Sequence, residues 1–202
     1  MIGKWHLGEG KAHEPTGFDH WEVLPGQGHY FDPVFISEKG DYEGKGYATD
    51  IITDKTIDFI DKRDKSKPFF VMSHHKAPHR SWECHPKHRE HYREDIKIPD
   101  TYHDDYKNRA KAAAAAKMRV ELDITYFDLG LAQPDGGEDE VGELMAAKVH
   151  QIAHRKIPMP ENVKKMKLID SYTGEVFRFE TREELSHFKY QRYMKRYLRT
   201  IQ

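Results

Sequence analysis

The sequence predicts an α/β fold in which helices flank a central, mostly parallel sheet. Residues 47–63 place apolar side chains at near-helical spacing, and Thr49 stands where the cap of that helix is expected. After a break, the apolar run PFFVMS (68–73) is typical of a strand buried inside a covered sheet. A helix followed by a buried strand is the repeating unit of α/β architecture. We therefore expect 68–73 to form an inner strand.

Composition and charge limit the classes of function. The 202-residue chain carries 33 basic and 34 acidic side chains, so its net charge of −1 gives no electrostatic reason to expect nucleic acid or an anionic membrane as a partner. No run approaches the roughly 20 apolar residues of a membrane-spanning helix, and residues 1–25 lack the pattern of a signal peptide. Cys84 is the single cysteine, which excludes a disulfide within the chain.

The elements on either side of this helix and strand follow from local composition. Residues 1–47 hold most of the glycines and several aromatic residues, which favours loops with short strands. Residues 86–93 and 103–118 are expected to be helical, the second because it contains five consecutive alanines. Residues 128–160 show weak periodicity, and we expect a surface excursion there.

The C-terminal part predicts a hairpin followed by a long helix. The segment KLIDSYTGEVFRFET (167–181) alternates apolar and polar residues on both sides of Thr173 and Gly174, where the turn is expected. Thr181 and Glu184 have the spacing of a capping box, and apolar residues recur behind them at helical spacing. We expect the basic residues of this helix to line its solvent-exposed side: Lys189, Arg192, Lys195, Arg196 and Arg199.

Two short segments carry the side chains best suited to chemistry. Lys4 and His6 in GKWHLG are two residues apart, so on an extended backbone both point to one face while Trp5 points to the other. They could present a positive charge and a proton-transfer group to one anion, although an isolated Lys-x-His pair is more often an ordinary surface feature. The second segment, HHKAPHR (74–80), follows the expected strand, and ligands of α/β sheets collect at the carboxyl ends of strands.

Several segments taken together resemble the type I sulfatases of the alkaline phosphatase superfamily, and in particular the bacterial polysaccharide and glycosaminoglycan sulfatases. They are IGKWHLG, GFDHW, LPGQGHYFDPVFI, GYATDIITD, KPFFVMSHHKAPHRSW and IPDTYHDDYKNR, in this order. The resemblance implies a partial alkaline-phosphatase-like sandwich. We expect residues 1–127 to be the central part of the catalytic domain, 128–170 an irregular excursion with a hairpin, and 171–202 the hairpin end and a helix returning to that domain.

The resemblance also implies roles for individual residues. In these enzymes a formylglycine, made from a cysteine or serine, attacks the sulfur while a calcium ion holds the sulfate oxygens. Lys4 would contact the sulfate, His6 would hydrogen-bond the formylglycine and help release sulfate, and His79 would contact the bridging oxygen or protonate the leaving alcohol. Such groups stabilise charge on the sulfate and leaving oxygens. The substrate would be a sulfated carbohydrate, contacted by Lys76, Arg80 and Trp82.

The sequence departs from the sulfatase pattern in two respects. The C/S-x-P-S-R motif that would supply the formylglycine is absent, and the similar stretch around Cys84 has Lys87 where serine belongs. The segments that hold the family's calcium ligands are not matched either. We therefore expect the chain to resemble an internal fragment of a sulfatase that is inactive alone. By the same resemblance, the parent protein would be periplasmic or secreted.

Three alternatives remain open from the sequence. A phosphodiesterase or phosphonate hydrolase relative would share the scaffold, and a non-catalytic module could retain the anion pocket and bind sulfated glycans. The third alternative is a metal-binding protein, because His85, His88 and His91 recur every three residues and would be neighbours on a helix. A solvated, histidine-rich helix face is the simpler explanation of that spacing.

Overall fold

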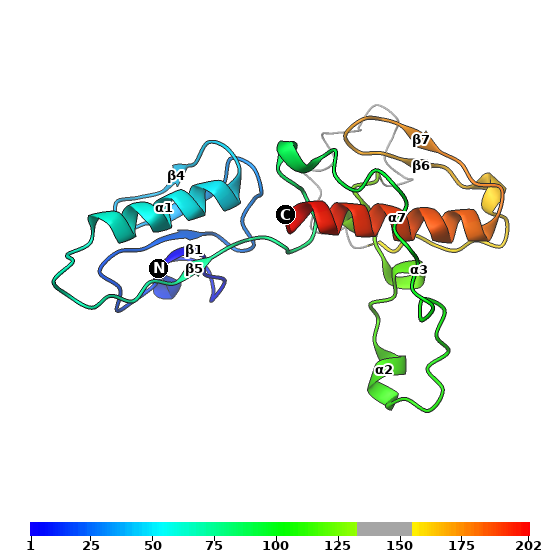
Figure 1. The fold of residues 1–202 in the computed structure, drawn as a ribbon, viewed down its shortest axis with the longest axis horizontal. Coiled ribbons are helices and arrows are strands. Elements are labelled where there is room, and N and C mark those ends of the chain that lie inside the picture. The colour runs from blue at the N-terminus through cyan, green and yellow to red at the C-terminus, as the bar shows by residue number, and fades with distance from the viewer. Residues whose placement is uncertain (133–154) are drawn as a thin grey trace. The chain divides into compact units, whose positions relative to one another are not determined.

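The computed structural model describes residues 1–132 and 155–202, which divide into two compact units, Met1–His79 and Arg80–Gln202. Each unit is described by itself (Figure 1). Within the described residues, no helix combines the length and apolar character needed to cross a membrane.

The first unit is built on a five-stranded sheet with the order β4-β3-β2-β1-β5. Its central strand β1 pairs in parallel with both β2 and β5, whereas β2–β3 and β3–β4 are antiparallel pairs. The α/β class with a parallel centre is therefore confirmed. The strand bounds are β1 Ile2–Lys4, β2 Glu22–Leu24, β3 Val34–Ser37, β4 Tyr42–Glu43 and β5 Ser73–His74.

Helix α1, Ala48–Lys62, packs on this sheet beside β1 and β5 (Figure 1). Its Ile52 is fully buried in a cluster with three residues of the strands, Ile2, Leu24 and Phe35. The predicted helix is confirmed, but the expected cap is wrong. Tyr47 is the N-cap residue with an extended backbone, and Thr49 already lies inside the first turn. The short 3-10 helix η1, Lys11–His13, lies in the glycine-rich loop that precedes β2.

The prediction of a buried strand over residues 68–73 is wrong for most of that run. Only its last residue belongs to β5, which is Ser73–His74, and pairing with β1 begins where the Ile2 N–H donates to the Met72 carbonyl at 2.9 Å. Phe69 and Phe70 are 47% and 74% exposed. Phe69 instead packs against the end of α1, so an apolar run alone does not establish burial.

The second unit is organised around the long helix α7, Arg182–Thr200, and the hairpin of β6, Leu168–Ile169, and β7, Val176–Phe177 (Figure 1). Its short helices are η2 Pro86–His88, α2 Lys111–Ala115, α3 Val120–Asp123, α4 Tyr126–Leu129 and η4 Val163–Lys165. The predicted N-cap is confirmed, because the Thr181 side chain accepts a hydrogen bond from the Glu184 N–H at 3.1 Å. The second bond of the expected capping box differs, because the Glu184 carboxylate accepts from the Glu180 N–H at 2.7 Å.

The predicted hairpin is also confirmed, and its turn has a clear local cause. The Asp170 carboxylate accepts hydrogen bonds from the backbone N–H groups of Tyr172 and Thr173 at 2.8 and 2.9 Å. Gly174 supplies the positive φ of 73° that the turn needs. The Gly174 N–H then closes the turn on the Asp170 carbonyl at 3.0 Å.

The two helices expected at 86–93 and 103–118 are much shorter than predicted. The first is only the 3-10 turn Pro86–His88, and the second is only Lys111–Ala115. Tyr106 and Asn108 adopt left-handed backbone conformations, with φ of 58° and 59°, which interrupt the second expected helix. A short alanine-rich helix without a buried face is not extended by propensity alone.

The expected surface excursion at 128–160 is wrong for its described flanks, and residues 133–154 lie outside the described residues. Leu129 and Leu131 before this gap and Ile157 after it are at most 2% exposed. They belong to the core of the second unit with residues of α7, the hairpin and the short helices: Ile124, Tyr126, Val163, Leu168, Phe179 and Leu185.

The expectation that the basic residues of α7 line its exposed side is wrong, because none of the five is exposed. Lys189 and Arg192 show this most clearly. Lys189 is 0% exposed, and its ammonium donates to the carbonyl oxygens of Glu121 and Ile157, each at 2.8 Å. Arg192 forms a partly buried ion pair with Asp170 at 2.5 Å. Both side chains lie on the face of α7 that packs on the rest of the unit, because they satisfy buried carbonyl and carboxylate oxygens there.

The buried ammonium of Lys189 predicts a pH dependence of stability. Burial lowers the pKa of Lys189 to about 8 from its ordinary 10.5. The unfolded chain therefore binds this proton more tightly, and the free energy of unfolding rises as the pH increases between those two values. We expect a gain of about 2 kcal/mol over this window. Chemical denaturation at pH 7 and pH 10 measures it, and Lys189→Met is expected to lack the gain.

The matched control is Lys117→Met, which removes an exposed lysine and should retain the pH dependence of the wild type. An unchanged pH dependence in Lys189→Met, checked as folded by circular dichroism, would contradict the assignment.

Candidate functional site

The carboxyl end of β1 places Lys4 where its strand meets β5. Gly3, the preceding residue, has a φ of 97° and pairs with His74 of β5. A Cβ at Gly3 would overlap the His74 carbonyl oxygen and lie 3.0 Å from its carbonyl carbon. Only glycine permits this close approach of two backbones. The Lys4 side chain is partly buried, and this burial lowers its pKa.

Gln27 gathers three of the cationic or titratable side chains of the first unit. Lys4 Nζ donates to Gln27 Oε1 at 2.5 Å, and the Gln27 amide nitrogen lies 3.0 Å from His6 Nε2. Lys76 Nζ donates to the Gln27 backbone carbonyl at 3.3 Å. Lys4 and His6 therefore meet at one amide, and Lys76 joins them from a segment about 70 residues away in the chain.

His79 joins the same group of residues through Tyr30. The Tyr30 hydroxyl donates to the His79 carbonyl at 2.5 Å, and Lys76 Nζ lies 4.6 Å from the centre of the Tyr30 ring. Lys76 is buried, whereas the His79 side chain is partly exposed. The contacts thus run continuously from Lys4 through Gln27, Lys76 and Tyr30 to His79, all inside the first unit.

Sequence reasoning missed Gln27 because glutamine carries no chemistry of its own. A usable signal was present in LPGQGHY, where Gln27 is held between two glycines. Gly26 and Gly28 both have positive φ, 50° and 66°, so the backbone forms a tight loop around Gln27. The Gln27 side chain from this loop contacts Lys4 and His6. His6 also has a positive φ of 53°, and such strain in a non-glycine residue is concentrated at functional sites.

Arg80 and Trp82 lie in the second unit, and the structure gives them local partners. Arg80 lies 3.4 Å from the buried carboxylate of Asp128. Trp82 packs edge-on against two tyrosines of α7, Tyr193 and Tyr197, with ring centres 5.0 and 6.1 Å away. These contacts support a packing role for Trp82. A role of either side chain in binding substrate stays a prediction.

The described residues do not supply a metal site. Among residues 1–132 and 155–202, no group of three or more His, Cys, Asp or Glu side chains could hold a metal ion. The rings of His85, His88 and His91 do approach one another, with centres 6.1 and 5.0 Å apart, as aromatic neighbours. The calcium of the sulfatases therefore does not fit the described residues, and no chemical step is assigned to it.

The arrangement in the first unit suits a tetrahedral oxyanion. Two ammonium groups and an imidazole converge on one polar loop at the carboxyl end of a parallel strand, where α/β sheets bind their ligands. Lysines stabilise the charge of such an anion, and histidine can transfer a proton near neutral pH. The fold and this cluster are those expected of an α/β protein that binds an oxyanion, and the binding itself stays a prediction.

The chain belongs to the sulfatase family, whose model, described as "Sulfatase", matches residues 1–201. It is 39% identical over 210 residues to N-acetylglucosamine-6-O-sulfatase of Bacteroides thetaiotaomicron, an alignment that covers 100% of this chain and 36% of that protein. Human N-acetylglucosamine-6-sulfatase is 31% identical over 85 residues, which are 40% of this chain and 15% of the human protein.

A solved structure supports the same assignment of fold. It contains a protein in complex with its substrate D-glucosamine-2-N,6-O-disulfate, matches with a TM-score of 0.70 and is 36% identical in sequence. The match covers 99% of this chain and 40% of the solved chain. The chain thus spans 36% of the Bacteroides thetaiotaomicron sulfatase and 40% of the solved chain, which is well under half the length of either.

Proposed function

We propose that this chain supplies the sulfate-contacting part of a sulfatase that hydrolyses 6-O-sulfate esters of N-acetylglucosamine in carbohydrates. The observation that carries the proposal is the convergence of Lys4, His6 and Lys76 around Gln27. The proposed substrate is supported by the names of the relatives, which are N-acetylglucosamine 6-sulfatases of a bacterium and of mammals. A protein of this kind would act outside the cytoplasm, in the periplasm or as a secreted enzyme.

In this proposal each residue has a defined role. Lys4 and Lys76 neutralise the sulfate, with Gln27 holding both ammonium groups in place before the substrate arrives. His6 lies beside the sulfur and assists release of the sulfate, and His79 protonates the leaving sugar oxygen. The calcium ion of the family would be held outside the described residues, which contain no suitable cluster. The nucleophile would also come from elsewhere, because the sequence has no C/S-x-P-S-R motif.

The test measures binding of N-acetylglucosamine 6-sulfate to the 202-residue chain by NMR titration. Lys4→Ala removes a charged hydrogen-bond donor, and we expect about tenfold weaker binding. Lys39→Ala, which removes an exposed lysine from the same unit, should bind like the wild type. Unsulfated N-acetylglucosamine should bind far more weakly than the sulfated sugar.

The same titration separates the proposal from its nearest alternative. A phosphodiesterase relative would prefer a phosphate diester at the 6-position of N-acetylglucosamine, such as the methyl phosphate diester, over the sulfate. Equal affinity of wild type and Lys4→Ala for the sulfated sugar would contradict the proposed site.

A further inference from the structure

The turn formed by residues 76–79 carries two of the side chains to which the proposed function gives a role. A hydrogen bond from the His79 N–H to the Lys76 carbonyl, at 3.0 Å, joins the two ends of this turn. Lys76 is only 7% exposed, so contacts inside the first unit set the position of its side chain. Groups that stabilise charge or transfer a proton act best when their positions are set before the substrate arrives.

One side chain, that of Tyr30, contacts both ends of the turn. Its hydroxyl donates to the His79 carbonyl at 2.5 Å. The face of its ring lies under the Lys76 ammonium, with Nζ 4.6 Å from the ring centre. The attraction between an ammonium and an aromatic face is stronger where both are shielded from water, as they are here. Tyr30 therefore holds the two ends of the turn by two different parts of its side chain.

Tyr30 is itself fixed to the beginning of α1. It is 2% exposed, and its carbonyl accepts a hydrogen bond from the Ala48 N–H in the first turn of the helix at 2.8 Å. Its ring stacks on that of Tyr47, the N-cap residue, with ring centres 6.0 Å apart and an angle of 17° between the planes. Helix α1 packs on β1 and β5. Tyr30 thus connects the turn to the rigid core of the first unit.

We infer that Tyr30 is a positioning residue of the candidate site, which holds the Lys76 ammonium with its ring and the His79 backbone with its hydroxyl. The roles of Lys76 and His79 toward the substrate come from the proposed function, on which this inference rests. Tyr30 acts through these two residues and does not itself touch the substrate. Two variants separate its contributions, because Tyr30→Phe removes only the hydroxyl whereas Tyr30→Leu removes the hydroxyl and the ring.

The ring contact is tested by NMR on the 202-residue chain without ligand. Protons above an aromatic face resonate upfield of their ordinary position. We expect the ε-methylene signal of Lys76, assigned from its loss in Lys76→Met, to be shifted upfield in the wild type and in Tyr30→Phe. In Tyr30→Leu it should return to the position of an exposed lysine such as Lys39. An unshifted Lys76 signal in the wild type would overturn the role of the ring.

The hydroxyl contact is tested by titration with N-acetylglucosamine 6-sulfate. Loss of one hydrogen bond in Tyr30→Phe should weaken binding about fivefold. The same change made in a His79→Ala background should have no further effect, because the hydroxyl acts through His79. A merely structural role would give equal losses in both backgrounds. Tyr42→Phe is the matched control. It removes a hydroxyl that donates to Glu22, and it should bind like the wild type.

This inference and the proposed function fail in distinguishable ways. If Lys4→Ala weakens binding while Tyr30→Phe does not, or if Tyr30→Phe causes the same loss with and without His79, the role of the hydroxyl is overturned and the proposed function stands. If Lys4→Ala binds like the wild type, the sulfate site is contradicted. The Lys76 signal then still decides, without any ligand, whether Tyr30 holds this ammonium. Circular dichroism of each variant checks that the fold is intact.

Discussion

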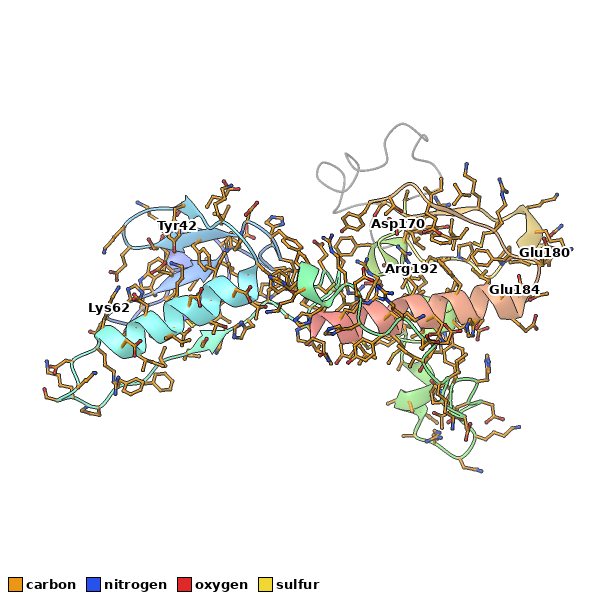
Figure 2. All side chains as sticks on the ribbon, turned by 45° about the horizontal axis from the view of Figure 1, so that its top comes forward. Tyr42, Lys62, Asp170, Glu180, Glu184 and Arg192 are labelled. Carbon is orange, nitrogen blue, oxygen red and sulfur yellow. The ribbon has the colours of Figure 1, made fainter. Side chains whose placement is uncertain are left out.

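Replacing Arg192 by methionine is expected to lower the free energy of unfolding of the second unit by about 3–5 kcal/mol. The Arg192 guanidinium donates to the carbonyls of Leu129 and Gly130, at 2.6 and 3.2 Å, and to the Asp170 carboxylate at 2.5 Å. Figure 2 shows Asp170 and Arg192 facing each other from the hairpin and from α7. Without the arginine, a carboxylate that is only 13% exposed loses its counter-charge.

The expected size of this stability loss follows from the burial of the Asp170 carboxylate rather than from the ion pair as such. Although burial raises the pKa of Asp170, the hydrogen bonds from Arg192 and from the turn N–H groups lower it overall. The carboxylate is therefore charged at neutral pH, and leaving it without its partner is costly. Denaturant unfolding, monitored by fluorescence, measures the loss.

The control is Arg93→Met. Arg93 forms an ion pair with Glu90 in which both side chains are more than 70% exposed, and such pairs contribute at most about 1 kcal/mol. If the two variants lost the same stability, the interpretation of Arg192 as the connection between hairpin and helix would be wrong.

Replacing Gly3 by alanine is expected to destabilise the first unit by about 3 kcal/mol or more. Two costs combine at this position. The φ of 97° is unfavourable for any residue with a Cβ, and the added methyl would overlap the His74 carbonyl oxygen in the paired strand β5. Because β1 and β5 meet at this pair, the substitution should also displace Lys4.

Gly17→Ala separates these two costs. Gly17 has a φ of 80°, but a Cβ there would have no neighbour within 4 Å. It should lose only the backbone contribution, about 1 kcal/mol. A Gly3→Ala protein that is as stable as Gly17→Ala would show that β1 and β5 separate without cost, contrary to the pairing described above.

Local signals allowed the hairpin and the N-cap of α7 to be predicted in the second unit. The hairpin turn depends on contacts between Asp170 and residues two to four positions away, and the cap of α7 joins Thr181 to Glu184. Interactions over so few positions depend on a few consecutive residues, so the sequence alone can predict them. The same holds for GKWHLG and HHKAPHR, whose composition and order predicted the family that the comparisons confirmed.

Other features depend on distant parts of the chain and could not be predicted in this way. Lys189 looks like a surface residue in sequence, yet it binds carbonyls 68 and 32 positions away, at Glu121 and Ile157. The exposure of Phe70 likewise depends on where strand pairing begins, not on the apolar run itself.

By itself, the sequence determined the family and the α/β class, which the comparisons and the structure confirm. That Lys4, His6 and His79 meet an anion stays a prediction. Only the tertiary structure decided that Gln27 gathers Lys4, His6 and Lys76, and which basic residues of α7 are buried. The physical reason is the range of the interactions. Capping, turns and residue type act over a few positions, whereas burial and side-chain convergence depend on segments that only the folded chain brings together.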